Sequence, residues 1–175
     1  MSKKAINICL IILGIFLIFL GVLSFFTESL IFGFGKGRDA TTLQNPTVGL
    51  NDEEAIEQFD ETFVRYLLYS IGAHKLHNPP FSSDTPKVEI YVGELVFNAE
   101  IDSGKILVNG KLESKDMIIR TTKIEAIKMI RDRDYIEESF KEGRSTIEPV
   151  ASKARLFAKG YAKVYITVTG RTVKE

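Results

Sequence analysis

The sequence predicts an α+β protein in which one N-terminal transmembrane helix precedes a single domain with an antiparallel sheet covered by helices. Two observations lead to this fold class. The stretch from Ala5 to Thr27 has no acidic or basic residue over about 23 residues, and a helix of that length crosses the ~30 Å hydrocarbon core of a bilayer. Beyond it, apolar residues recur first with a helical period and then with a period of two, which is typical of helices followed by strands.

Residues 1–28 comprise the N-terminal tail and the predicted transmembrane helix. A cleaved signal peptide is the alternative, because Lys3 and Lys4 precede the apolar stretch. That stretch exceeds the roughly 7 to 15 apolar residues of a signal-peptide core and is followed by no clean small-x-small cleavage site, so an uncleaved single-pass anchor is favoured. Positive-inside counting favours, by a small margin, a cytoplasmic N-terminus and an extracytoplasmic domain.

Composition excludes several classes of function. The 23 basic and 23 acidic side chains balance, and the part beyond Lys3 and Lys4 has a slight excess of acid, so we expect no nucleic-acid partner. The single cysteine, Cys9, lies within the predicted span. The remaining chain therefore has no disulfide and no cysteine ligand for a metal, and no motif predicts a cofactor.

Residues 29–50 contain several glycines and are predicted to be a flexible linker, and residues 51–175 are predicted to be the α+β soluble domain. Asn51 and Glu54 have the spacing of a capping box, which starts a helix. Apolar residues then recur at intervals of three and four as far as Ile71, so the pattern predicts one continuous helix that ends at Gly72.

Alternating apolar residues predict a series of strands joined by tight turns. Gly104 lies in one predicted turn and Asn109-Gly110 is a second strong turn signal, so consecutive strands are expected to be antiparallel neighbours. The predicted strands cover residues 87–92, 95–101, 106–108 and 117–119.

Further helices and strands follow. Thr122 and Glu125 have capping-box spacing and open a helix, and Asp134 with Glu137 repeats this signal for a short helix that ends at Gly143. The remaining predicted elements are an edge strand over 146–150, a helix over 151–159 that Gly160 ends, and a final strand over 161–169 in which Val164, Ile166 and Val168 alternate with polar or aromatic residues.

Three segments together resemble the sterol carrier protein 2 (SCP2-like) lipid-transfer family. They are the hairpin GELVFNAEIDSGKILV, the strand and capped helix KDMIIRTTKIEAIKMI, and the helix end, short strand and apolar helix FKEGRSTIEPVASKARLFAKG, within about residues 88–161. In that family an antiparallel sheet covered by helices encloses an apolar tunnel, so the resemblance implies a fatty acyl or sterol-like ligand here. The anchor and the added C-terminal strand VYITVTG depart from the family pattern, and a tethered domain does not shuttle freely between membranes.

Apolar side chains of the sheet and helices are candidates for the lining of a ligand cavity. Inward-facing apolar residues serve a packed core equally well, and the sequence leaves both interpretations open. The candidates are Phe97, Ile119, Ile127, Ile130, Phe140 and Phe157.

The sequence contains little evidence for a catalytic site or a metal site. His74 and His77 are the only histidines, and they stand in a proline-rich segment without a cysteine to complete a zinc site, so no metal is predicted. No GxSxG nucleophile elbow is present, and an enzymatic function rests on no motif.

Two functional hypotheses follow. The first is a membrane-anchored domain that binds an apolar or lipid-like ligand close to the bilayer. The second is a membrane-tethered interaction or assembly module with a solid core, whose protein partner binds an exposed strand edge or the first helix. The sequence sets no oligomeric state for either.

Overall fold

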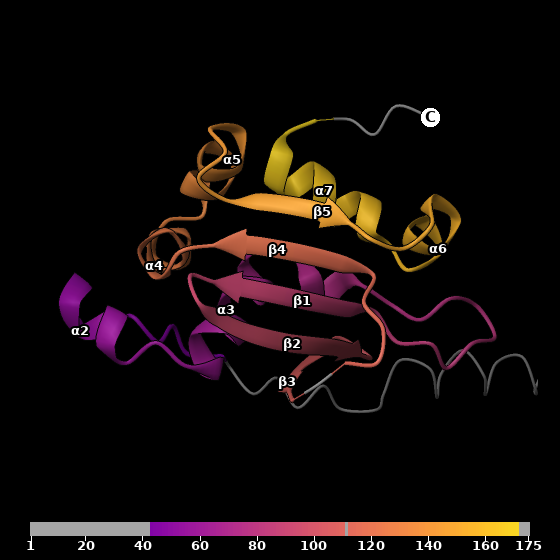
Figure 1. The fold of residues 1–175 in the computed structure, drawn as a ribbon, viewed down its shortest axis with the longest axis horizontal. Helices are drawn as coiled ribbons and strands as arrows, with labels where there is room; N and C mark the ends of the chain where they lie inside the picture. The colour runs from indigo at the N-terminus through magenta and orange to yellow at the C-terminus, as the bar shows by residue number, and fades with distance from the viewer. Residues whose placement is uncertain (1–42, 111, 172–175) are drawn as a thin grey trace, which may run out of the picture. The chain divides into compact units, whose positions relative to one another are not determined.

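The computed structural model describes residues 43–110 and 112–171, in which the chain forms five strands and several helices (Figure 1). Its elements, in chain order, are α2 (Asp52–Glu57), α3 (Glu61–Ser70), the 3-10 helix η1 (Ala73–Lys75), β1 (Lys87–Val92), β2 (Leu95–Asp102), β3 (Lys105–Asn109), β4 (Met117–Thr121), α4 (Lys123–Arg131), α5 (Asp134–Lys141), β5 (Thr146–Pro149), α6 (Lys153–Ala158) and α7 (Tyr161–Thr169). The predicted transmembrane helix from Ala5 to Thr27 lies outside the described residues. Within those residues, no helix is both long enough and apolar enough to cross a membrane.

The five strands form one mixed sheet in the order β3-β2-β1-β4-β5. The α+β class is confirmed, but the prediction of a purely antiparallel sheet is wrong, because β1 and β4 are parallel, with Val88 opposite Met117. The turn signal at Asn109-Gly110 does not return β3 into an adjacent antiparallel strand. The hairpin of β2 and β3 instead forms part of the connection between β1 and β4, which is the long crossover that parallel neighbours require.

The tight turns of the sheet agree with the sequence. Val92 pairs with Leu95 across Gly93-Glu94, and Asp102 pairs with Lys105 across a two-residue turn. Gly104 has the predicted positive φ of 81°, and Ser103 has a φ of 51°, so both central residues adopt the left-handed conformation that a type I′ hairpin turn needs.

The two faces of the sheet differ in character. One face carries apolar side chains such as Val88, Ile90 and Ile119, which belong to a single buried cluster with the helices. Figure 1 shows α3 behind the sheet and α4, α5, α6 and α7 along its β4–β5 side. The opposite face carries charged and aromatic side chains, and there the Arg120 guanidinium lies 4.3 Å from the Tyr91 ring centroid.

The predicted helix from Asn51 to Ile71 is two helices, α2 and α3. The Asn51–Glu54 capping box is present as expected. The break is caused by Asp60, whose Oδ1 accepts hydrogen bonds from the Thr62 and Phe63 amides at 2.8 and 3.4 Å and so starts a new helix. Phe59 and Phe63 still face the same core, which is why the apolar period runs across the break.

The segment 161–169, predicted to be a strand, is the helix α7. Gly160 and Gly170 flank it with φ values of 82° and 62°, and the Gly170 amide donates to the Ile166 carbonyl as a helix C-cap. Tyr161, Val164 and Val168 are buried at helical spacing, whereas Ile166 is 42% exposed. The apolar residues of this segment thus fit both the strand period of two and the helical period of about 3.6. The segment forms a helix because that conformation buries Tyr161, Val164 and Val168 against the domain.

Candidate ligand groove

Two open hollows adjoin one another on the helical side of the domain. The larger, of about 900 Å³, lies among α3, η1 and α5, and the smaller, of about 300 Å³, lies beside α7. Gly72, Lys75 and Thr167 line both of them, so the two are continuous, and we call them together the α7 groove. Its volume is in the range of small-molecule sites.

One wall of the α7 groove is built where α3 ends. Gly72 takes a φ of 87°, which ends α3 and turns the chain into η1. The His74 ring stacks on Tyr69 with the ring centroids 4.2 Å apart, and its Nδ1 lies 3.2 Å from the Tyr69 carbonyl oxygen. Burial lowers the pKa of His74 against the effect of that carbonyl, and Lys75 and Arg133 lower it further, so this histidine is a neutral part of the wall near pH 7.

The smaller hollow has an apolar floor and a basic rim. Ile71, Val164 and Ile166 supply the apolar surface, and Lys75 and Lys163 are its ionisable residues. Ile166 carries the exposed part of that floor, because Ile71 and Val164 are almost fully buried. A surface of this kind suits a ligand with an apolar chain and an acidic end.

The acidic side chains of the larger hollow are partly paired within the protein, and Arg144 is shared because it also pairs with Glu125. Glu137 pairs with Lys141, and Glu138 and Glu142 both pair with Arg144. In contrast, Lys75, Arg133 and Lys163 form no ion pair with any described residue, although Asp134 has none either. The larger hollow therefore has charges of both signs, and the basic character of the groove is confined to the smaller hollow, which is lined by Lys75 and Lys163.

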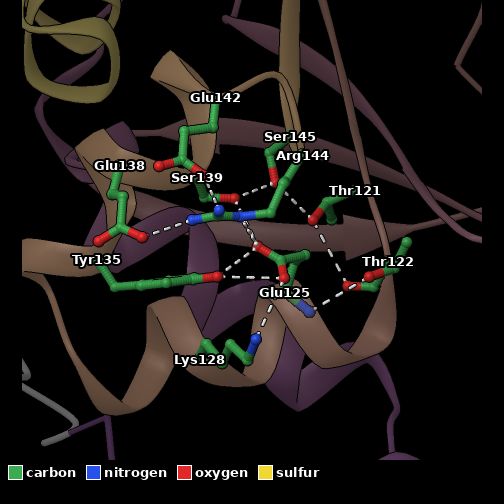
Figure 2. Close-up of polar contacts among 10 residues, drawn as sticks. All are labelled: Thr121, Thr122, Glu125, Lys128, Tyr135, Glu138, Ser139, Glu142, Arg144 and Ser145. Atoms are coloured by element: carbon green, nitrogen blue, oxygen red, sulfur yellow. Dashed lines mark hydrogen bonds and ion pairs between the residues drawn. The ribbon is translucent and has the colours of Figure 1, made fainter.

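A buried carboxylate fixes the position of α5, which forms the far wall of the groove. Glu125, in the first turn of α4, accepts hydrogen bonds from Tyr135 Oη at 3.0 and 3.2 Å and from Ser139 Oγ at 2.9 Å (Figure 2). Burial would raise the pKa of Glu125, but these hydrogen bonds and the charges of Lys128 and Arg144 outweigh it, and the pKa is lowered. The ionised carboxylate thus ties α4 to α5.

The same network reaches the sheet through hydroxyl groups. Ser139 Oγ lies 2.9 Å from Ser145 Oγ, which lies 2.8 Å from Thr121 Oγ1 in β4. Arg144 donates to Glu125 at 3.3 Å and to Glu138 at 2.8 Å, as Figure 2 shows. Ser139 and Ser145 are almost completely buried, so neither serine is placed to attack a substrate, and the cluster positions α5.

A second buried network fixes the start of α7. Asp116 Oδ2 accepts from Lys159 Nζ and the Lys87 amide, both at 2.9 Å, and from Tyr161 Oη at 3.3 Å. Asp116 and Lys159 are both fully buried. Burial and the negative charge of Asp116 raise the pKa of Tyr161 well above its usual value, so the phenol stays protonated and donates.

The cavity candidates from the sequence lie elsewhere. Ile119, Ile127 and Ile130 are buried in the core, Phe97 and Phe140 are partly buried against it, and Phe157 is 51% exposed. None of the six lines the α7 groove.

The predicted histidine pair is separated by its environment. His74 lines the groove, whereas His77 Nδ1 lies 3.0 Å from the Asn78 carbonyl oxygen. In the part of the chain that the structure describes, no three metal-ligating side chains come together.

Sequence reasoning missed the residues of the groove. Its two sides come from Lys75 and its neighbours and from Lys163 to Thr167, nearly ninety positions later. The one local signal was Gly72, whose place as a helix end was predicted. The helical spacing of Tyr161, Val164 and Val168 was a signal for α7 that the alternating pattern obscured.

Comparison with known proteins finds no related sequence and only a weak similarity to solved structures. No family model and no curated protein sequence matches this chain. Among solved structures it is similar to "UbiJ-SCP2 Ubiquinone synthesis protein", with 9% identity, coverage of 65% of this chain and 85% of the other, and a TM-score of 0.35. It is also similar to sterol carrier protein 2 like 2 from Aedes aegypti, with 16% identity, coverage of 57% and 94%, and a TM-score of 0.34. Both are SCP2 domain proteins, and these scores are too low to place the chain in that family.

Proposed function

We propose that this protein is a membrane-anchored domain that binds an apolar or lipid-like ligand in the α7 groove. The observation that carries the proposal is the smaller hollow, in which Ile166 is left 42% exposed above a floor of Ile71 and Val164. A ligand chain on this floor removes apolar surface from water, which is the main source of affinity for such ligands.

Two lysines of the groove indicate where the polar end of the ligand would lie. Lys75 stands at the junction of the two hollows and Lys163 borders the smaller one. An acidic end group of the ligand would form ion pairs with these two amines, which have no ion-pair partner among the described residues. The apolar chain of the ligand would then cover Ile166. The ligand class proposed is therefore an acyl chain with an acidic end.

The membrane part of the proposal rests on the sequence. The 5–27 stretch is long and apolar enough to remain in a bilayer, which keeps the domain close to a supply of lipid. Alkaline washing of membranes from cells that make the full chain tests this part. An anchored chain stays with the membrane fraction and begins upstream of Phe26, whereas recovery from the wash or a start beyond Phe26 contradicts the anchor.

Ligand binding is tested with a photoactivatable fatty acid and the full chain in phospholipid vesicles. After irradiation, we expect labelling in peptides that contain residues 161–169, and we expect Ile166→Gln to reduce it about tenfold, because about 1.5 kcal/mol of apolar burial is lost. Ile124→Gln is the matched control, since Ile124 is also 42% exposed but lies on α4 outside the groove. Equal labelling of the two variants, or labelling confined to other segments, contradicts ligand binding at this site.

The second candidate is a membrane-tethered interaction module. It is favoured by the burial of Ile119, Ile127 and Ile130 in one apolar cluster, as in a packed core, and by β3, an edge strand with Leu107 44% exposed. Crosslinking of the full chain in native membranes tests it. A protein neighbour linked through β3 or α2 supports this candidate, and recovery of lipid alone contradicts it.

A further inference from the structure

Phe81 is held in an exposed and strained position. The residue is fully exposed, more so than any other large apolar residue that the structure describes. Its φ is 61°, in the left-handed region, which costs a residue with a side chain about 1 to 2 kcal/mol. A fold that keeps a bulky aromatic residue in such a backbone conformation, without burying it, suggests that the side chain meets something outside the domain.

The backbone of the loop around Phe81 is restricted by its sequence and its hydrogen bonds. Pro79 and Pro80 precede the aromatic residue and restrict the backbone, and the Ser82 amide donates to the Pro79 carbonyl at 3.1 Å. The base of the loop is bound to the helices, because Arg155 donates to Asp84 Oδ1 at 3.0 Å. The aromatic ring therefore projects from a loop whose base is bound to α6.

A second exposed aromatic residue lies on the helix that supports this loop. Phe157 in α6 is 51% exposed, and α6 also carries Arg155, the residue that binds Asp84. Figure 1 shows α6 and the η1–β1 connection at the same end of the sheet. Lys153, at the start of α6, is exposed and forms no ion pair with any described residue. We call Phe81, Phe157 and Lys153 together the aromatic tip.

We propose that the aromatic tip contacts the surface of the lipid bilayer, with the two phenylalanine rings inserted at the level of the headgroups. Aromatic and aliphatic side chains next to a lysine are the combination that interfacial segments use, because the rings enter the acyl boundary while the amine meets lipid phosphates. This contact rests on the proposed anchor. Fifteen residues, 28–42, separate the apolar stretch from the described domain, and a chain of that length reaches at most about 50 Å, so an anchored domain stays near the membrane.

The chain contains no tryptophan, which permits a clean fluorescence test. Phe81→Trp in the full chain, reconstituted in vesicles of phosphatidylcholine with phosphatidylglycerol, is expected to be quenched by lipids brominated near the headgroup end of the chains. Ile124→Trp is the matched control, because Ile124 is 42% exposed on α4 at the other end of the sheet. We expect at least a threefold stronger quenching at position 81 than at position 124.

Flotation of the same vesicles separates this inference from the anchor. If the chain floats with the vesicles and the two tryptophans are quenched equally, the tip contact is overturned while the anchor stands. If the chain does not float, the anchor fails, and the tip contact fails with it. A further variant, Phe81→Trp combined with Phe157→Ser, is expected to show weaker quenching than Phe81→Trp alone, and unchanged quenching removes Phe157 from the proposed contact.

Discussion

Lys159 Nζ lies 2.9 Å from Asp116 Oδ2, and both side chains are fully buried. The ammonium also donates to the Thr85 carbonyl at 2.7 Å and lies 2.9 Å from Asp84 Oδ2, so its charge is matched by three acceptors. This contact joins the residue before β4 to the end of α6, two residues before α7, and it therefore holds one side of the α7 groove in place. Buried pairs of this kind are costly to break, and here Asp116 would keep only the partly exposed Arg155 as a cationic partner.

The first prediction concerns this pair. Lys159→Met should lower the free energy of unfolding by about 3 kcal/mol, the lower end for a broken buried pair, because Asp116 loses its buried cation and keeps Arg155, whose Nε lies 2.9 Å from Asp116 Oδ1. Lys153→Met is the control, since Lys153 is an exposed residue of α6, and it should change the free energy by less than about 0.5 kcal/mol. Urea titration of the full chain measures both. Adding Asp116→Asn to Lys159→Met should recover part of the loss, and no recovery would show that packing, not charge, is responsible.

The second prediction follows from the lowered pKa of Glu125. Burial raises this pKa and the hydrogen bonds of Ser139 and Tyr135 lower it by more, so the folded protein holds the proton less tightly than the unfolded chain, whose value is near 4.5. The stability contributed by ionised Glu125 is therefore fully present above that value and is lost as the pH falls through the folded-state pKa. Glu125→Gln should flatten the loss of stability between about pH 6 and about pH 3. Glu94→Gln, in an exposed turn, should keep the wild-type profile, and identical profiles for all three proteins would refute the role of Glu125.

The third prediction tests the helical start of α7. At Gly160, with a φ of 82°, an added Cβ would lie 3.3 Å from His77 Nε2. Gly160→Ala should therefore lower the free energy of unfolding by about 1 to 2 kcal/mol through backbone strain alone. Gly110→Ala provides the comparison, because a Cβ there meets nothing within 4 Å. A strand over 161–169, as its alternating residues suggest, would have no need of a left-handed residue at 160, so an unchanged stability would argue against α7.

These residues show which parts of the fold are readable from sequence. Asn51 with Glu54, Thr122 with the Glu125 amide, and Gly104 are local signals that act over three or four residues, and the structure has each of them. The parallel pairing of β1 with β4 and the helix α7 depend on residues far apart in the chain, so local periodicity was misleading for both. The α7 groove likewise joins Lys75 to Lys163, and Asp116 meets Lys159 across 43 positions, which no spacing rule detects.

The fourth prediction concerns the acidic end of the ligand. Lys75→Gln and Lys163→Gln should each reduce photolabelling of α7 by a fatty acid about threefold to tenfold, because a charge-assisted hydrogen bond is lost, and should leave labelling by a fatty alcohol of the same length unchanged. Lys105→Gln, an exposed lysine of β3 outside the groove, is the control. If both lysine variants are labelled like the wild type by both probes, the hypothesis of an acidic end group is contradicted, whereas apolar binding in the groove is not. If the wild type labels with neither probe, apolar binding itself is wrong.

The fifth prediction separates a surface role of Phe81 from a structural one. Asparagine tolerates the left-handed region that Phe81 occupies at a φ of 61°, so Phe81→Asn should leave the free energy of unfolding unchanged or raise it by up to about 1 kcal/mol. Phe81→Val should lower it, since a β-branched residue is strained there. The same Phe81→Asn protein should lose bilayer contact at the tip, seen as weaker quenching of a tryptophan placed at Phe157. A clear loss of stability in Phe81→Asn would show that the ring supports the loop, and its exposure would then need no membrane to explain it.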